Sequence, residues 1–470
     1  MRVLTPHPPG RSPGRSWLPP MTTPLQAARR ARGWSQVRMV SELMRLARWK
    51  EIRVASAASL KTQLSRWENG HVTPDYYQAL LCELLRATPG ELGFGIQDLP
   101  SGPARENSQG TALIAKREWT RDDINSLSTS FDDAISGSVL ADIEMLAHEW
   151  LAVDKPQLVE LSAGRRIGDS LVATAEHRVI QLRRADDFVS GRTSHTLVHQ
   201  ELQATTKLLD EATLTDDQTR RLLTATGELA QLAAWVTADA GLYKQAARYT
   251  EGGVLAAHAA DNEPLAANVI STLSYQLANT GNPRKAALLA RTAYAGARHS
   301  ATATTKALLL ERVAWADAKS GDLASCERML GQVENNFNHA KPEDDPDWVY
   351  WLNREEIDVM AGRCFTELRQ PARAEPLLRT ATSGYDNALI RENALYLSWL
   401  AEDYILLNEI EYASEVATRV LELGSRANSA RTDERLRHLA RLLRRYQDVQ
   451  AVIDFLGQYK DLSQRIHRDS

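Results

Sequence analysis

Cysteine and long apolar runs are scarce in this sequence of 470 residues. The three cysteines, Cys82, Cys326 and Cys364, are widely separated and form no Cys-X-X-Cys pair, so neither a disulfide framework nor a zinc site is indicated. No apolar stretch approaches the roughly 20 residues that span a bilayer. The positively charged N-terminus also lacks the apolar core of a secretory signal, so we expect a cytoplasmic protein.

The motifs of familiar enzyme classes are also missing. The sequence contains no Walker-type phosphate loop, no nucleophile elbow and no glycine-rich dinucleotide fingerprint. His195 and His199 lie one helical turn apart, as two metal ligands could. However, no Glu follows the first His and no third ligand is near, so two ordinary histidines are the default interpretation. We expect a protein that is not an enzyme and that needs neither metal nor cofactor.

Helix-favouring residues dominate what is present. Glycine and proline are modest in number and β-branched runs are rare, whereas Ala, Leu, Arg and Glu recur throughout. This composition favours an all-α fold, and the length favours two or more domains. Residues 21–93 carry 11 Lys and Arg against 6 Asp and Glu, although the whole chain has a formal net charge of −4. A basic head on an acidic body indicates a polyanionic partner for the head.

Changes of composition divide the chain into five parts. Residues 1–20 are rich in Pro, Gly and Arg, so we expect a disordered leader or a start-site artefact. Residues 21–94 contain several short helices, and 95–118 form a polar linker rich in Gly, Pro and Ser. Residues 119–225 are helical and are either degenerate repeats or a separate region. Residues 226–462 contain clear repeats.

The repeats combine small residues and turns at intervals near 40 residues. Each copy has a small residue, a turn residue, an alanine-like residue and a second small residue. The five copies are Ala234, Gly241, Ala246 and Gly253; Ser274, Gly281, Ala286 and Ala293; Ala314, Gly321, Cys326 and Val333; Gly362, Arg369, Ala374 and Ala381; and Ala401, Asn408, Ala413 and Val420.

This spacing predicts stacked helical hairpins. Two antiparallel helices approach closely only where small side chains meet, and a tight reversal needs a residue that tolerates positive φ. The positions resemble those of the tetratricopeptide (TPR) repeat, although the period is longer and few of the large consensus residues are present. The resemblance implies a C-terminal solenoid of TPR-like helical hairpins. The alternative is an alanine-rich bundle in which the spacing arises by chance.

The head shows the boundaries of four short helices. Pro24 suits the first turn of one helix, and Gly33 suits its exit. Ser35 can cap a second helix, a third covers residues 60–68, and a fourth begins near Thr73. The run from Leu64 to Gly70, which follows an Arg-Gly-Trp-Ser-Gln segment, resembles the helix-turn-helix of phage-repressor-like (XRE-type) DNA-binding domains.

That resemblance implies that the third helix reads DNA bases in the major groove. Carried over by position, the base-reading residues are Lys61, Thr62 and Arg66, with Gln63 beside them, whereas Trp67 belongs to the core. Lys and Arg suit guanine, Gln suits adenine and Thr suits the thymine methyl group. The alternatives are a surface ion pair of Arg66, for example with Glu68, and a solvated face for Lys61.

Further residues resemble contacts to the DNA backbone. Gln36 and Asn69 stand at the family's phosphate-contacting positions. The interval between the second and third helices is longer than in the compact family pattern, and this insertion contributes Arg45, Arg48 and Arg53. We expect it to lengthen the second helix or to form a loop, and to add phosphate contacts. The alternative is an exposed basic segment with no role in DNA binding.

The segment Pro-Glu-Asp-Asp-Pro-Asp-Trp-Val-Tyr-Trp-Leu lies where the repeat spacing stretches. Its Trp348, Tyr350 and Trp351 are candidates for a partner contact, because aromatic residues are favoured anchors. Packing between hairpins is the other interpretation, and the favoured one.

Together these features resemble helix-turn-helix regulators with TPR-like repeats that control differentiation and antibiotic production in mycelial bacteria. The resemblance implies a sequence-specific regulator that binds double-stranded DNA, with a body that senses a peptide, protein or small-molecule partner. Because one recognition helix covers few base pairs, a homodimer on two half-sites is expected. The alternative is a TPR-like interaction scaffold whose helix-turn-helix does not act on DNA.

Overall fold

The computed structural model describes residues 23–49, 56–68, 75–85, 87, 92, 113–114, 116, 118–136, 143–152, 157–158, 165–188, 191–383, 389–427 and 429–468. The expected leader and most of the expected linker lie outside these residues. The chain divides into two compact units, residues 1–105 and 106–470, called here the head and the body. Of the helices that are described, none combines the length and the apolarity that crossing a membrane requires.

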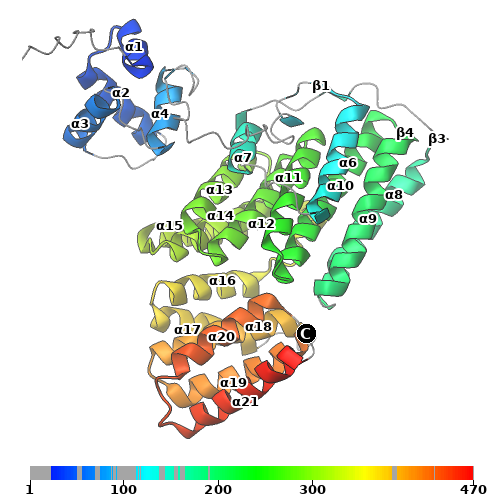
Figure 1. Ribbon diagram of the computed structural model, residues 1–470, viewed down its shortest axis with the longest axis vertical. Coiled ribbons are helices and arrows are strands. Elements are labelled where there is room, and N and C mark those ends of the chain that lie inside the picture. The colour runs from blue at the N-terminus through cyan, green and yellow to red at the C-terminus, as the bar shows by residue number, and fades with distance from the viewer. Residues whose placement is uncertain are drawn as a thin grey trace, which may run out of the picture. The chain divides into compact units, whose positions relative to one another are not determined.

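The described part of the head consists of four helices (Figure 1). They are α1 (Pro24–Ala31), α2 (Gln36–Trp49), α3 (Ala57–Trp67) and α4 (Asp75–Leu85). Each contributes apolar side chains to one core: Leu25, Met39, Val40, Leu43, Leu60, Leu64, Trp67, Leu80, Leu81 and Leu85. The helical spacing of these residues along the chain is the reason why they meet on one side of each helix.

The expected ends of the first two helices are confirmed. The Thr23 side chain accepts a hydrogen bond from the backbone N–H of Gln26, and Pro24 follows it in the first turn of α1. Gly33 has φ of +68° just after that helix. Ser35 Oγ accepts from the backbone N–H of Arg38 at 3.1 Å, as a helix cap does. The predicted cap near Thr73 lies outside the described residues.

The basic insertion lengthens the second helix, which was one of its two expected outcomes. Helix α2 continues through Arg45 and Arg48 to Trp49, and both arginine side chains are exposed. Residues 50–55, including Arg53, lie outside the described residues. The insertion therefore presents part of its charge on the end of a regular helix.

The body begins with elements that the repeat pattern did not predict. They are β1 (Glu118–Trp119), α6 (Arg121–Ser136), α7 (Ile143–Ala152), β2 (Gln157–Leu158), β3 (Arg165–Arg166), α8 (Asp169–Asp186), α9 (Gly191–Glu211) and β4 (Ala212–Thr213). The strands form two short parallel pairs, β1 with β2 and β3 with β4. Leu113 and Ile114, within the expected linker, are buried in the core of the body, so its packing starts before residue 119.

Five antiparallel helical hairpins follow, and a sixth helix pair ends the described part of the body; Figure 1 shows their stacking. The first helices are α10 (Asp216–Asp239), α12 (Glu263–Asn279), α14 (Ala303–Lys319), α16 (Arg354–Glu367), α18 (Ile390–Leu406) and α20 (Ala430–Leu443). Their partners are α11 (Tyr243–Ala259), α13 (Pro283–Ala297), α15 (Leu323–Phe337), α17 (Pro371–Ser383), α19 (Ile410–Ala427) and α21 (Gln450–Arg468). The first helices of successive pairs pack against one another and form an inner layer. Stacked hairpins are thus confirmed.

All five predicted turn positions have left-handed backbone conformation. Gly241, Gly281 and Gly321 have φ of +82°, +93° and +75°, and Arg369 and Asn408 have φ of +58° and +64°. Such values favour glycine, so the last two turns are made at some cost in backbone energy. All five turns share this left-handed backbone geometry, which explains why the repeat spacing continues in the last two copies, where the turn residue is not glycine.

The predicted small positions are buried where the paired helices meet. Ala234, Ala246, Ser274, Ala286, Ala293, Ala314, Cys326, Ala374, Ala401, Ala413 and Val420 are each fully buried. At Gly362 an added Cβ would lie 2.6 Å from Leu378 Cγ, which shows how closely α16 approaches α17. The small side chains therefore determine the spacing within each hairpin.

The longer third interval is explained by two short 3₁₀ helices between α15 and α16. They are η1 (Pro342–Asp344) and η2 (Asp347–Val349), and η2 packs against α8. The acidic and aromatic segment is thus an insertion, and through η2 it packs the middle of the solenoid against α8.

Candidate functional site

In the head, α3 has one buried and one exposed side. Leu60, Leu64 and Trp67 are buried, and the Trp67 ring lies 5.0 Å from the ring of Tyr77 on α4. Lys61 is exposed and Gln63 is half-buried. This orientation agrees with the expectation that Trp67 is a core residue. Thr62 and Arg66 belong to α3, but their side chains and the whole of Asn69 lie outside the described residues.

A buried ion pair positions the end of α3. Arg29 on α1 contacts Glu68 through two nitrogens, with Nη2 donating to Oε2 at 2.9 Å. The hydrogen bond to Glu68 raises the pKa of Arg29 above its ordinary value. The Thr23 hydroxyl also donates to the backbone oxygen of Glu68. Glu68 is therefore buried and bound by Arg29; the side chain of Arg66, its alternative partner in a surface ion pair, lies outside the described residues.

The expected phosphate contacts have different surroundings. Gln36 Nε2 donates to Glu68 Oε2 at 2.9 Å, so its amide is part of the buried network. Arg45 forms an exposed pair with Glu42 on the same helix at 2.5 Å. Arg48 is exposed near the end of α2. The structure therefore brings Gln36 to the end of α3 and leaves the two arginines at the surface of α2.

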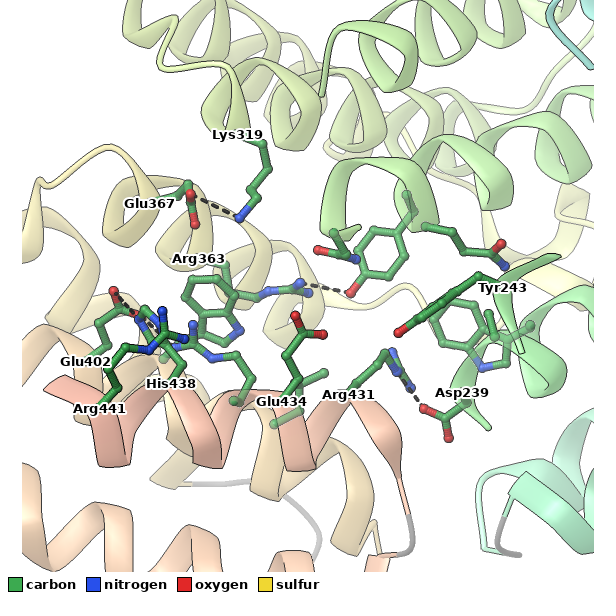
Figure 2. Close-up of a pocket in the computed structure, with 18 of the residues that line it drawn as sticks. Asp239, Tyr243, Lys319, Arg363, Glu367, Glu402, Arg431, Glu434, His438 and Arg441 are labelled. Carbon is green, nitrogen blue, oxygen red and sulfur yellow. Dashed lines mark hydrogen bonds and ion pairs between the residues drawn. The ribbon is translucent and has the colours of Figure 1, made fainter. Parts of the chain in front are cut away.

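In the body, the described helices of the inner layer line two partly open cavities, of about 220 and 720 Å³. Residues from five inner helices line both of them: Trp235, Tyr275, Arg363, Leu395 and Arg431. Such volumes are typical of small-molecule sites, which lie between the helices of a bundle and combine aromatic walls with a few polar groups. Figure 2 shows the smaller cavity with its charged side chains directed inward from several helices.

Carboxylates neutralise much of the positive charge in the smaller cavity. Glu402 accepts a hydrogen bond from Arg435 Nη2 at 2.7 Å and lies 3.2 Å from His438 Nε2. Burial alone would raise the pKa of Glu402, but Arg435 and His438 outweigh it and lower that pKa to about 2. Lys319 pairs with Glu367 at 3.1 Å across the cavity edge (Figure 2).

Ion pairs also close the inner layer across great distances in sequence. Asp239 on α10 accepts from Arg431 Nε at 2.7 Å and from Ser429 Oγ at 2.8 Å. Arg391 on α18 donates from Nη2 to Asp186 Oδ2 at 3.2 Å and lies 3.4 Å from Asp239. The end of α10 therefore contacts the start of α20, and the end of α8 contacts the start of α18, because the curvature of the solenoid brings these ends together.

The three candidate aromatic residues line the larger cavity, and two of them, Trp348 and Trp351, also pack on the main core of the body. Trp348 is buried in the main core of the body, which supports the packing interpretation. Tyr350 donates from its hydroxyl to Asp187, and the Arg184 guanidinium lies 3.4 Å above its ring. All three line the larger cavity, together with Asp187.

The two histidines of α9 lie near each other and near Tyr249. The rings of His195 and His199 lie 6.4 Å apart, and the Tyr249 hydroxyl is 3.3 Å from His199 Nδ1. Burial and His199 lower the pKa of His195. Among the described residues, no group of three or more His, Cys, Asp or Glu side chains is placed to hold a metal ion.

Sequence reasoning missed the cavity residues, although a signal was present. Glu311 and Arg312 interrupt an otherwise apolar run in α14, and Arg363 is flanked by Gly362 and Cys364 in α16. Charged residues are rarely fully buried unless they are paired. A charged residue on the side of a repeat helix that carries small, inward-facing residues was therefore a sign of a polar interior.

Comparison of the chain with models of known families and with curated proteins found no match in either.

Proposed function

We propose that this protein is a sequence-specific DNA-binding transcription regulator, in which the head binds DNA and the body senses a partner. The observation that carries the proposal is the orientation of α3: its apolar side and Trp67 are buried, whereas Lys61 faces solvent. A recognition helix needs such an arrangement, because its outer side must enter the major groove. The basic charge of the head supports the same role.

The body supports the sensing role. Its inner layer is closed by buried ion pairs and contains a cavity of about 720 Å³. A regulator that responds to a signal needs a second site that is separate from its DNA-binding surface.

We further propose a homodimer, since one short recognition helix reads too few base pairs for useful specificity. A monomer by analytical ultracentrifugation, both free and on DNA, would count against it.

The test measures binding of the full chain to DNA fragments selected from random sequence. Arg66→Ala should cost about 1–3 kcal/mol on the selected site and much less on unrelated DNA, since base contacts specify and phosphate contacts do not. Lys61→Ala should behave in the same way. Arg379→Ala is the control, because Arg379 lies on α17 of the body and forms an exposed ion pair with Glu375 on the same helix.

Three outcomes distinguish base reading by α3, backbone contact by α3 and a scaffold that does not bind DNA. Selective loss on the enriched site supports base reading by α3. Equal loss on both DNAs reduces Arg66 and Lys61 to backbone contacts. Failure to enrich or bind any DNA contradicts the proposal and favours the interaction scaffold.

A further inference from the structure

We propose that the larger cavity of the body is a receptor site for a small organic anion. The carboxylate or phosphate group of this ligand would bind Arg312 and Arg363 beside Tyr275. The flat apolar part of the ligand would lie against the aromatic side chains that line the cavity. The binding site stands on the geometry of the body alone, whereas its regulatory meaning rests on the function proposed above. Two arginines that line this cavity, Arg312 and Arg363, have no carboxylate partner among the described residues.

Arg312, on α14, is the first of these. Only 6% of its surface is exposed, and it lines the larger cavity. Its Nε is buried without a partner, and its guanidinium forms no hydrogen bond or ion pair with any described residue. It lies over two rings instead, 4.7 Å from the centre of Tyr275 and 5.8 Å from that of Trp351. Cation–π contacts of this kind offset only part of the cost of a buried charge.

Arg363, on α16, is the second. It is 5% exposed, and its Nη2 donates to the Tyr275 hydroxyl at 2.8 Å. Trp315 and Trp399 lie 4.7 and 5.4 Å from its guanidinium carbon. Its Nε has no partner among the described residues. The guanidinium is thus held in place by aromatic rings and a neutral phenol, with donors left over for an anion.

Other arginines in the same cavity are paired, which singles these two out. Arg391 contacts Asp186 and Asp239, and Arg354 lies 2.6 Å from a Glu334 oxygen. The fold therefore supplies a carboxylate where an arginine only stabilises the structure. An unpaired buried charge costs several kcal/mol. Such a cost is typical of functional sites that are completed by a ligand.

The local electrostatic potential agrees with this assignment. Burial would raise the pKa of Tyr275, yet the nearby guanidinium groups of Arg363, Arg431 and Arg312 lower it to about 8. Glu311, the acid next to Arg312 in sequence, is fully buried, and burial raises its pKa to about 8. It is therefore mostly protonated at neutral pH and does not neutralise Arg312. The guanidinium groups of Arg363 and Arg312 thus act together on the Tyr275 hydroxyl, and they favour an anion beside it.

The size and the walls of the cavity indicate the rest of the ligand. Its volume of about 720 Å³ falls within the range of small-molecule pockets. Tyr275, Trp351 and Tyr396 provide aromatic surface in its lining. A flat ring with one acidic group matches this combination of stacking surface and arginine donors.

The test is calorimetric titration of the full chain, without DNA, with indole-3-acetate, benzoate and phenyl phosphate. Indole-3-acetamide and acetate serve as probes that lack the charge or the ring. We expect at least one aromatic acid to bind, and the neutral amide and acetate to bind about tenfold more weakly or worse. Arg312→Met should abolish the preference for the acid. Arg354→Met is the matched control, because it removes an arginine of the same cavity whose charge is already neutralised.

Thermal unfolding of the unliganded variants separates a receptor role from a structural one. Arg312→Met keeps the apolar stem and removes an uncompensated charge, so its Tm should equal or exceed that of the parent. A large loss of Tm would make Arg312 a structural residue and overturn the proposal. So would equal binding of acid and amide, or the absence of binding by all three acids at millimolar concentration.

These outcomes are distinguishable from failure of the proposed function. If the acid binds but the chain does not bind DNA, the receptor site stands and the regulator proposal falls. If DNA binds but no acid does, the opposite holds.

Discussion

Arg29 and Glu68 form a buried ion pair that joins the first and third helices of the head. Their side chains are 8% and 1% exposed, and the carboxylate also accepts a hydrogen bond from Gln36 on α2. One carboxylate thus connects three helices at the end of the proposed recognition helix. The position of α3 depends on this contact as well as on the apolar core.

Replacing Glu68 by Gln should destabilise the head by about 3 kcal/mol, because Arg29 would remain buried without a counter-charge. Hydrogen exchange of the α1 and α3 amides, followed by mass spectrometry, should accelerate by about a hundredfold. Glu42→Gln is the control, since it breaks only an exposed pair with Arg45 and should cost less than about 1 kcal/mol. Similar exchange in both variants would show that the ion pair does not hold α3.

The arginines at the end of α2 should affect DNA affinity through salt dependence. If Arg45 and Arg48 each contact a phosphate, changing both to Ala should reduce the slope of log K against log[salt] by roughly 2. The measurement is binding of the full chain to DNA at several salt concentrations. An unchanged slope, with or without Arg53→Ala in addition, would mean that the insertion has no role in DNA binding.

Two glycines of the body should respond to alanine with opposite signs. Gly281 has φ of +93° in a hairpin turn, and an added Cβ would meet nothing within 4 Å, so only the backbone opposes Gly281→Ala. We expect a loss of about 1–2 kcal/mol. Gly331→Ala, within α15 and also without close neighbours, should stabilise by about 0.5–1 kcal/mol. Urea unfolding measures both variants, and the absence of a loss in Gly281→Ala would contradict the turn assignment.

Glu311 should make the body less stable as pH rises. Burial raises its folded-state pKa from 4.5 to about 8, so the folded protein binds a proton that the unfolded chain releases. The destabilisation that Glu311 causes is therefore absent below about pH 4.5 and grows as the pH increases towards 8. Glu311→Gln removes this penalty and should stabilise the body by roughly 3 kcal/mol at most near pH 7.

Thermal unfolding at several pH values tests this prediction. The Tm difference between Glu311→Gln and the parent should grow from about pH 4.5 to pH 8. Glu334→Gln is the control with the opposite sign, because the hydrogen bond with Arg354 lowers the pKa of Glu334. A Tm difference for Glu311→Gln that does not change with pH would show that this carboxyl titrates normally.

Local signals were sufficient for the helices and their turns. Capping residues marked the starts of α1 and α2, and the spacing of small residues marked five hairpins, because both depend on neighbours within a few turns of helix. The turn at Asn408 shows this well, since its positive φ was predicted from spacing without a glycine. The aromatic residues Trp348 and Tyr350 were noticed, but their contacts were left open.

The contacts between distant segments of the body could not be predicted from such local signals. Arg391 and Asp186 are far apart in sequence, and they meet only because several hairpins accumulate curvature between them. The short strand pairs at the start of the body were missed for a similar reason: two-residue strands have no periodic pattern to detect.

The sequence by itself determined the all-α class, the repeat spacing and the turn positions, because helix capping, small-residue contacts and positive φ act over short distances. Only the tertiary structure decided which charged side chains face inward and which of them find a partner. Arg391 and Arg312 are both buried and both line the larger cavity, yet Arg391 is neutralised by distant carboxylates and Arg312 has no carboxylate partner among the described residues. That difference depends on how six inner helices converge, which no local pattern encodes.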